Sequence, residues 1–543
     1  MASIKGSTTG TEDLARAGTP EWTALSVLVL AVLLIAIDGT VLSLAIPAIS
    51  ADLGASATQL LWIGDVYSFA LAGLLVTMGT LGDRLGRKRL LMIGAASFGA
   101  ASLLAAFAPT PGWLIAARAM LGVAGATLMP STLSIIRNTF RDARQRTTAI
   151  AVWGAAASGG AAAGPLLGGL LLEHFWWGSV FVINVPVMVL LVVLGQRVIP
   201  ESRDPRPGPF DPLSAVLSFA GIIAIVYAVK EAAAQGPSPV VAVAAAAGVA
   251  ALWAFGRRQR LLPVPLLDVS LFRRPAFSGA VSANLLSALA LSGLLFLLSQ
   301  HFQLVQGYGP LESGLRQLPL TLASLAVVAV VALLVRRVGR GRLVGCALLL
   351  AAGGTALLAF AEGQAAYGWT AVALTATGLG VGLSLTLTTD VVVSEVPPSK
   401  AGAASAVSET AYELGIALGI ALVGSLHAAL YRSGLDLPAA LPPRVADAAQ
   451  ESLPSAVQVA ARLPDALAGP VLTAARDTFT DALQTTSAAA AVLLAFAAVL
   501  AWRVIPTPVR TPAQDDAGSD RHRKAHQNVA QRNHSTRKET DDV

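Results

Sequence analysis

Five ionisable side chains lie inside long apolar stretches of this 543-residue chain: Asp38, Asp65, Arg118, Glu409 and Glu413. On insertion scales, an ionised group at the centre of a bilayer costs roughly 2.5–3.5 kcal/mol, so such residues are functional candidates by default. Burial raises the pKa of a carboxyl group and a nearby cation lowers it, so these acids are suited to exchanging protons near neutral pH. They would also attract a cationic ligand. Competition between proton and ligand for the same acids would couple proton entry to cation exit.

Arg118 is the natural partner of Asp38, which it would hold charged until a proton or a substrate intervenes. Glu409 and Glu413 are four residues apart and therefore share one helix face, where two acids repel unless something binds between them. Two other interpretations stay open. Asp38 and Arg118 would also suit a static structural ion pair, and Asp65 would also suit a vestibule without direct contact to a ligand.

Two aromatic residues, Trp62 and Tyr67, flank Asp65. A ring face attracts an organic cation within about 6 Å of its centroid, so the pair is a candidate substrate-binding element. The alternative for Trp62 is a place in the aromatic belt at the membrane–water interface.

The elements that carry these residues are membrane helices. The chain is 55% hydrophobic and 13% charged, against about 25% charged residues in soluble domains, which argues against a soluble enzyme and against a disordered chain. About 20 apolar residues span a bilayer, and backbone groups in lipid must pair within their own segment, so we expect an all-α integral membrane protein. Fourteen segments qualify: 22–48, 60–81, 89–108, 113–136, 147–171, 179–198, 212–230, 239–256, 276–303, 312–335, 342–361, 367–393, 401–430 and 485–505.

The loops predict the orientation. Arg and Lys clusters fall in alternate loops, at 84–89, 137–146, 197–206, 257–274 and 336–342, whereas the short loops between them hold only Lys230, at a helix edge. Cytoplasmic loops are rich in Lys and Arg, so both termini are expected in the cytoplasm. These clusters are topology signals, and we expect no nucleic-acid partner.

The segments suggest two six-helix halves and an inserted pair, an internal symmetry typical of transporters. The expected parts are a cytoplasmic tail (1–21), an N-terminal six-helix bundle (22–200), inserted linker helices (201–262), a C-terminal six-helix bundle (263–506) and a disordered cytoplasmic tail (507–543). The outer loop 431–484 contains several prolines. We expect a solvated loop with short helices, and the alternative is an extracellular gate or partner site.

The sequence lacks the motifs of disulfide-stabilised proteins, ATPases, metalloenzymes and hydrolases. The chain has one cysteine, Cys346, and no Gly-Lys dipeptide, HExxH, CxxC or GxSxG. Disulfides within the chain and P-loop ATP hydrolysis are therefore excluded. We expect no cofactor, no metal and no enzymatic activity. A run of small residues, Gly160, Gly164, Pro165, Gly168 and Gly169, instead predicts close packing of one helix with its neighbours.

Several motifs, in the expected order across residues 22–505, resemble the major facilitator superfamily and, within it, the 14-helix drug:proton antiporters of the QacA and LfrA type. Gly79–Arg89 is similar to the signature between helices 2 and 3, Leu114–Pro130 to the helix 4 motif, and Gly160–Gly169 to the helix 5 motif of exporters. Asp38–Val41 with Ala45–Pro47, Leu61–Ser68 and Ser408–Gly415 resemble the motifs of the multidrug exporters.

The resemblance implies the major facilitator fold and a proton-driven export of lipophilic cations, such as dyes and quaternary ammonium compounds, across a bacterial cytoplasmic membrane. It implies proton coupling by Asp38 and Glu413 with Arg118, and substrate recognition by Glu409. It also implies that Asp65 recognises the second positive charge of divalent cationic substrates. For conformational gating it points to Gly79, Asp83, Arg84, Gly86 and Arg87 with the helix 5 residues. The partners are then small hydrophobic cations, protons and the bilayer, without ATP, and we expect a monomer.

The chain also departs from this pattern. Glu413 stands where some relatives carry Asp, and segment 312–335 has no acid at mid-depth, which predicts a narrower range of divalent cations. The alternative within transport is a dedicated exporter of one endogenous metabolite, antibiotic or lipid. Outside transport, a sensor or scaffold is disfavoured by the intact acids, and a membrane enzyme by the lack of a nucleophile–base or metal constellation.

Overall fold

The computed structural model describes residues 17–140, 142–203, 211–263, 265–266, 268–364, 366–396, 401–438 and 441–505. The predicted tail 507–543, most of the tail 1–21 and the linker 204–210 therefore lie outside the described residues. Within the described part the chain is helical and contains no strand. The expectation of an all-α protein is confirmed.

Helices follow one another along the described chain with short connections. They are α1 (Thr19–Leu53), α2 (Ala57–Leu85), α3 (Arg87–Ala106), α4 (Pro111–Thr139), α5 (Ala143–His174), α6 (Ser179–Val182), α7 (Asn184–Val198), α8 (Pro212–Gln235), α9 (Pro239–Leu261), α10 (Pro275–Gln300), α11 (Pro310–Val338), α12 (Arg340–Ala361), α13 (Tyr367–Ser394), α14 (Ala401–Gly434), α15 (Pro443–Glu451), α16 (Leu453–Ala460) and α17 (Asp465–Val504), with a 3₁₀ turn, η1 (Val269–Arg273), and a π-helical turn, η2 (His301–Val305).

Polar caps set where several long helices begin. The side chains of Ser56, Thr110, Asp211 and Ser238 accept hydrogen bonds from backbone N–H groups in the first turns of α2, α4, α8 and α9. The first four N–H groups of a helix have no partner inside it, so a cap residue of this kind stabilises the start of the helix.

Thirteen helical segments among the described residues are long and apolar enough to cross a membrane. The expected segment missing from this set is 312–335. It lies in α11, which is helical over 29 residues but includes side chains outside the described part. The count of fourteen therefore stays a prediction.

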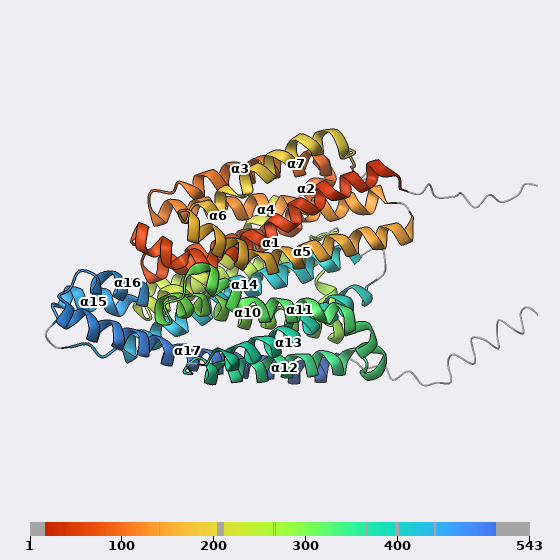
Figure 1. The fold of residues 1–543 in the computed structure, drawn as a ribbon. Coiled ribbons are helices and arrows are strands. Elements are labelled where there is room, and N and C mark those ends of the chain that lie inside the picture. The colour runs from red at the N-terminus through yellow and green to blue at the C-terminus, as the bar shows by residue number, and fades with distance from the viewer. Residues whose placement is uncertain are drawn as a thin grey trace, which may run out of the picture.

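The long helices run side by side as a bundle (Figure 1). Both ends of the described chain, Ala17 and Ile505, lie at one end of the bundle, called the terminal end below. Helices α15 and α16 lie at the opposite end, the loop end. Helices α1–α7 form one side of the bundle and α10–α14 with α17 the other, and the two sides meet where α2 packs on α14 and α5 on α11.

The inserted helices α8 and α9 pack on each other, and α8 also contacts both α2 and α14. A buried cluster of Phe69, Val226, Ala417 and Ala421 joins these three helices. Helix α8 thus lies along the line where the two sides of the bundle meet. Outside the spans, Arg258 binds the Asp211 carboxylate with Nε 3.0 Å from Oδ2 and, by this hydrogen bonding, lowers the pKa of Asp211 to about 2. The pair ties the start of α8 to the end of α9.

The region 431–484 is more ordered than a solvated loop. Helix α17 begins at Asp465, twenty residues before the expected span, and the short helices α15 and α16 bury Ala449, Leu453 and Ala456. The expectation of short helices is confirmed, but they pack against the bundle and do not stand free in solvent.

Candidate functional site

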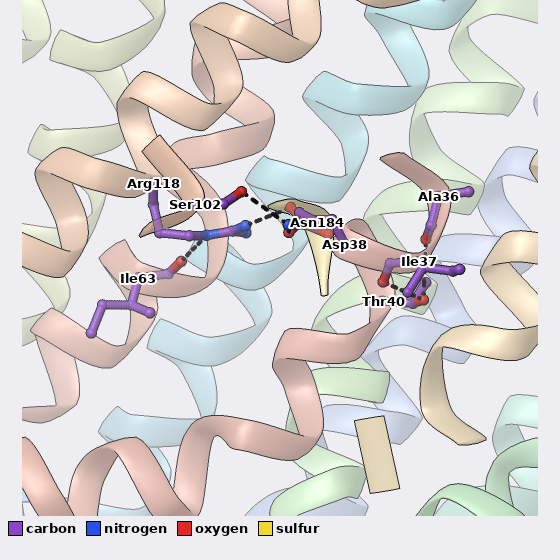
Figure 2. Close-up of polar contacts among 8 residues, drawn as sticks. All are labelled: Ala36, Ile37, Asp38, Thr40, Ile63, Ser102, Arg118 and Asn184. Carbon is purple, nitrogen blue, oxygen red and sulfur yellow. Dashed lines mark hydrogen bonds and ion pairs between the residues drawn. The ribbon is translucent and has the colours of Figure 1, made fainter. Parts of the chain in front are cut away.

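Asp38 lies on α1 in a buried polar cluster (Figure 2). Arg118 Nη1 is 3.0 Å from Asp38 Oδ2, and Asn184 Nδ2 donates to Asp38 Oδ1 at 2.8 Å. Asp38 and Arg118 are each 1% exposed. The expected pairing of Asp38 with Arg118 is therefore present, and Asn184 is a partner that sequence reasoning missed.

Asn184 lies where the chain breaks between α6 and α7. The span expected over 179–198 is divided at Ile183 into α6 and α7, and Asn184 is the first residue of α7. Its amide also donates to Ser102 Oγ of α3 at 3.2 Å. An Asn inside an otherwise apolar segment was the signal in the sequence that could have identified it.

Close contact between α2 and α4 positions Arg118. A Cβ atom at Gly122 would lie 2.3 Å from the Tyr67 carbonyl oxygen, so only glycine allows the two helices to approach this closely. One turn earlier on α4, Arg118 Nε donates to the Ile63 carbonyl at 3.2 Å, and its guanidinium lies 4.6 Å from the centroid of the Tyr67 ring. Tyr67 therefore stacks against Arg118, which differs from the expected role beside Asp65.

Asp65 is occupied by a cation from the chain itself. Lys230 Nζ of α8 lies 2.8 Å from Asp65 Oδ1 and 2.7 Å from Oδ2, and both side chains are buried. The same ammonium lies 3.8 Å from the centroid of the Trp62 ring. The placement of Lys230 at a helix edge in an outer loop was wrong, because α8 continues five residues beyond the expected segment 212–230 and packs against α2 here.

The two acids of α14 differ in burial. Glu413 is buried, interacts with the Ser68 hydroxyl and lies within electrostatic reach of Arg118 and Glu409. Glu409 is only partly buried. Both are on the helix that packs against α2, so the fold brings the acids of α14 towards those of α1 and α2.

Four buried oxygen atoms of this cluster have no hydrogen-bond partner: Asp65 Oδ2, Tyr67 Oη, Asn184 Oδ1 and Glu413 Oε2. Asp65 Oδ2 is close to Lys230 Nζ, but only Oδ1 receives the hydrogen bond. An unsatisfied buried polar group costs about 1–3 kcal/mol, and the two carboxylate oxygens among these atoms can accept a proton or bind a cation.

The motif residues at the terminal end form a second unit. Asp83 and Arg87, two of the expected gating residues, form an ion pair, with Arg87 Nη2 2.7 Å from Asp83 Oδ1. Gly86 has φ +105°, a conformation that favours glycine, and a Cβ atom there would meet the Glu201 carboxylate at 2.7 Å. Glu201 accepts from the Lys88 and Arg89 backbone N–H groups, and it too escaped the sequence analysis.

The glycine run of α5 allows two close contacts. A Cβ atom at Gly160 would meet the Leu33 carbonyl of α1 at 2.4 Å, and one at Gly164 would meet Thr40 Oγ1 at 1.8 Å. The Pro165 carbonyl faces the other side, where a Cβ atom at Gly314 of α11 would meet it at 2.3 Å. The predicted close packing is present, against α1 on one side and α11 on the other.

Among the described residues, no group of three or more His, Cys, Asp or Glu side chains is arranged to hold a metal ion. The polar groups of the cluster are carboxylates, one guanidinium, one ammonium and one amide, beside aromatic rings.

Comparison with known proteins places this arrangement in a family. The model of the Major Facilitator Superfamily matches residues 28–420. The chain belongs to the major facilitator superfamily. As a member of this superfamily it is a multi-pass membrane transporter rather than an enzyme.

Two curated relatives within the superfamily span nearly the whole chain. The multidrug efflux pump LfrA of Mycolicibacterium smegmatis is 48% identical, over 90% of this chain and 97% of the pump. The methyl viologen resistance protein SmvA of Salmonella typhimurium is 40% identical, over 89% of this chain and 98% of the relative. Among solved structures, a bacterial homologue of the human lysosomal transporter Spinster, in an inward-facing and occupied conformation, matches with a TM-score of 0.64 at 16% identity over 90% of this chain and 97% of that chain. At this identity the likeness concerns the fold.

Proposed function

We propose that this transporter exports lipophilic organic cations in exchange for protons. The observation that carries the proposal is the buried cluster in which Asp38, Arg118 and Asn184 lie next to further acids on α2 and α14. Removing an ion pair from water has a desolvation cost, and removing one partner leaves an uncompensated buried charge that costs roughly 3–5 kcal/mol. The names of the efflux pump LfrA and of SmvA support export of drugs.

The electrostatic contacts suggest how exchange works. Arg118 interacts with Asp38, Asp65 and Glu413, so its positive charge is shared among three acids. Protonation of Asp38 abolishes its ion pair with Arg118. Arg118 then neutralises the remaining acids, Asp65 and Glu413, more strongly, so these acids bind a cationic substrate less tightly. Deprotonation restores the pair with Asp38 and frees an acid for the next cation. Substrate and proton thereby exclude each other.

The remaining parts of the proposal concern setting and driving force. We infer a bacterial cytoplasmic membrane with both termini in the cytoplasm, from the basic loops, and a monomer that needs no cofactor because the proton gradient supplies the energy. Glu409 and Trp62 contribute to substrate recognition. The Asp83–Arg87 pair with Gly79, Arg84 and Gly86 acts in conformational gating at the terminal end.

The test is transport in proteoliposomes with an acidic interior, followed with ethidium, whose fixed charge prevents simple pH trapping. Wild type is expected to accumulate ethidium as protons leave the vesicle. Asp38→Asn and Glu413→Gln are expected to lose this accumulation. Glu362→Gln is the matched control, because Glu362 is a buried acid that pairs with Ser487 between α12 and α17, away from the cluster. It should retain transport.

Two outcomes would overturn the proposal. Gradient-driven accumulation that survives in Asp38→Asn would remove the coupling role of α1. Wild-type vesicles that move no lipophilic cation would point to a single native metabolite or lipid as the substrate.

A further inference from the structure

Lys230 has the chemistry of a bound ligand. Lys230 is 2% exposed, and its ammonium lies between both oxygens of Asp65 and the face of the Trp62 ring. The residue belongs to α8, one of the two inserted helices. A carboxylate and an aromatic face are the two features that recognise an organic cation, and here they surround a primary ammonium of the chain itself.

We propose that Lys230 is a tethered cation that fills the Asp65–Trp62 subsite and must be displaced before this subsite accepts a cationic group of a substrate. The inference rests on the proposed function and deepens it. Lys230 is thus a specificity-determining residue. It leaves the transporter with fewer free acids and biases it towards substrates that carry one positive charge.

Three features of the geometry favour displacement over a permanent ion pair. Asp65 Oδ2 accepts no hydrogen bond in the described part of the chain and Lys230 Nζ is 2.7 Å from it, so departure of the ammonium would leave this oxygen open to another cation. The lysine stem is flexible and its ammonium is a point charge, in contrast to the forked guanidinium that holds Asp38. Helix α8 also contacts both α2 and α14, so the subsite lies on the line where the two sides of the bundle meet and would sense their relative movement.

The charges at the subsite predict how removal of Lys230 changes ligand binding. With Lys230 in place, a second positive charge entering near Asp65 meets a cation of like sign. Without Lys230, Asp65 becomes a free buried acid. Removal of the lysine should therefore strengthen binding of a dication much more than binding of a monocation.

The experiment uses two ligands that differ by one charged group, decyltrimethylammonium and decamethonium. Their affinities for the full-length protein in nanodiscs are measured by calorimetry, and the ratio of the two dissociation constants is compared between variants. Lys230→Gln is expected to shift this ratio about tenfold in favour of decamethonium. The double variant Asp65→Asn with Lys230→Gln, which has no acid left to free, should lose that gain.

Arg257→Gln is the matched control for loss of one positive charge from the inserted pair. Arg257 is exposed and stacks on Trp253 at 5.5 Å from the ring centroid, so it repeats the cation–ring contact at the surface without a buried acid. Its ratio should equal that of wild type. If the ratio of the two dissociation constants is unchanged in Lys230→Gln, the inference is overturned. In that case the proposed function still stands as long as wild type binds decyltrimethylammonium. If wild type binds neither ligand nor ethidium, the proposed function fails as well.

A second measurement needs no substitution and serves if Lys230→Gln fails to fold. Lys230 is one of six lysines in the chain, and its position over the Trp62 ring should shift its side-chain NMR signal upfield in lysine-selective ¹³C labelling. Saturating decamethonium is expected to return that signal to an ordinary lysine position, whereas decyltrimethylammonium should leave it shifted. A signal that stays shifted with decamethonium bound would show that the lysine is a permanent structural partner.

Discussion

At the scale of single residues, the Asp38 carboxylate is distinguished by the number and kind of its donors. Arg118 supplies charge and a hydrogen bond to Oδ2, and the neutral amide of Asn184 supplies a second bond to Oδ1. Hydrogen bonds to a charged group are stronger than those between neutral groups. A carboxylate held in this way can lose one partner to protonation and still be oriented by the other.

Replacement of Asn184 by alanine tests this division of labour. The Asn184→Ala variant removes one donor to Asp38 but leaves the ion pair, so transport should fall several-fold without disappearing, and the folded state should lose roughly 1.5–3 kcal/mol. Ethidium transport in proteoliposomes and thermal unfolding in detergent provide the two readouts. Ser102→Ala, which removes only the second partner of the amide, is the control and should have the smaller effect. Equal transport in Asn184→Ala and wild type would contradict the role of Asn184.

At the scale of elements, α5 combines a rigid contact with α1 and a contact with α11. Its glycines remove the side chains that would otherwise separate the helix axes, since a Cβ atom at Gly164 would overlap Thr40. Small residues at such positions are the usual way for membrane helices to approach closely. At the α5–α11 contact, movement between the two sides of the bundle is therefore expected to carry α5 together with α1.

Two glycine-to-alanine substitutions on α5 distinguish the effect of helix packing from the effect of replacing a glycine as such. Gly164→Ala places a methyl group 1.8 Å from Thr40 Oγ1 and 3.2 Å from the Ile37 carbonyl. Overpacking of this kind typically costs about 1–3 kcal/mol, so thermal stability should fall and transport should be reduced at least several-fold. The control is Gly159→Ala, on the same helix, where the added Cβ has no neighbour within 4 Å. Both variants are compared by unfolding in detergent and by transport, and equal behaviour would refute the packing argument.

At the scale of the whole molecule, the loop end joins the two sides of the bundle. Gln458 of α16 donates to the Ser50 carbonyl of α1 at 2.6 Å, the Ala57 N–H donates to Glu451 at 3.3 Å, and Gln303 donates to the Leu44 carbonyl at 3.0 Å. A small cavity lined by Leu61, Phe296, His427, Tyr431, Leu453 and Phe479 lies under these contacts. Helices α15 and α16 thus close the loop end between the two sides.

Export requires this closure to open, which a reversible cross-link tests. In a Cys346→Ser background, Ser50→Cys with Gln458→Cys is joined by a short, reducible bis-thiosulfonate linker. Transport should fall at least tenfold and return on reduction. The control joins Gly434→Cys to Thr478→Cys, where a Cβ at position 434 would lie 3.3 Å from the Thr478 methyl group and both residues belong to the same side of the bundle. Full transport with the first link intact would show that the loop end stays closed during the cycle.

Much of the fold and part of the site follow from sequence alone. Apolar length and the obligation of backbone groups to pair in lipid determine an all-α membrane protein. The price of an ionised group in lipid singles out Asp38, Asp65, Arg118, Glu409 and Glu413, and spacing on one helix relates Glu409 to Glu413 because helix geometry is local.

Only the tertiary structure decided the partner of Asp65 and the second donor to Asp38. Lys230 and Asp65 are separated by 165 residues and Asn184 and Asp38 by 146, so their contacts depend on how helices pack and where a helix breaks. A residue at the apparent edge of an apolar segment is either solvated or buried, and segment ends are the least certain part of a sequence pattern. Helix α8 runs past its apparent end and packs against α2, which turns a residue of an apparent loop into the buried partner of Asp65.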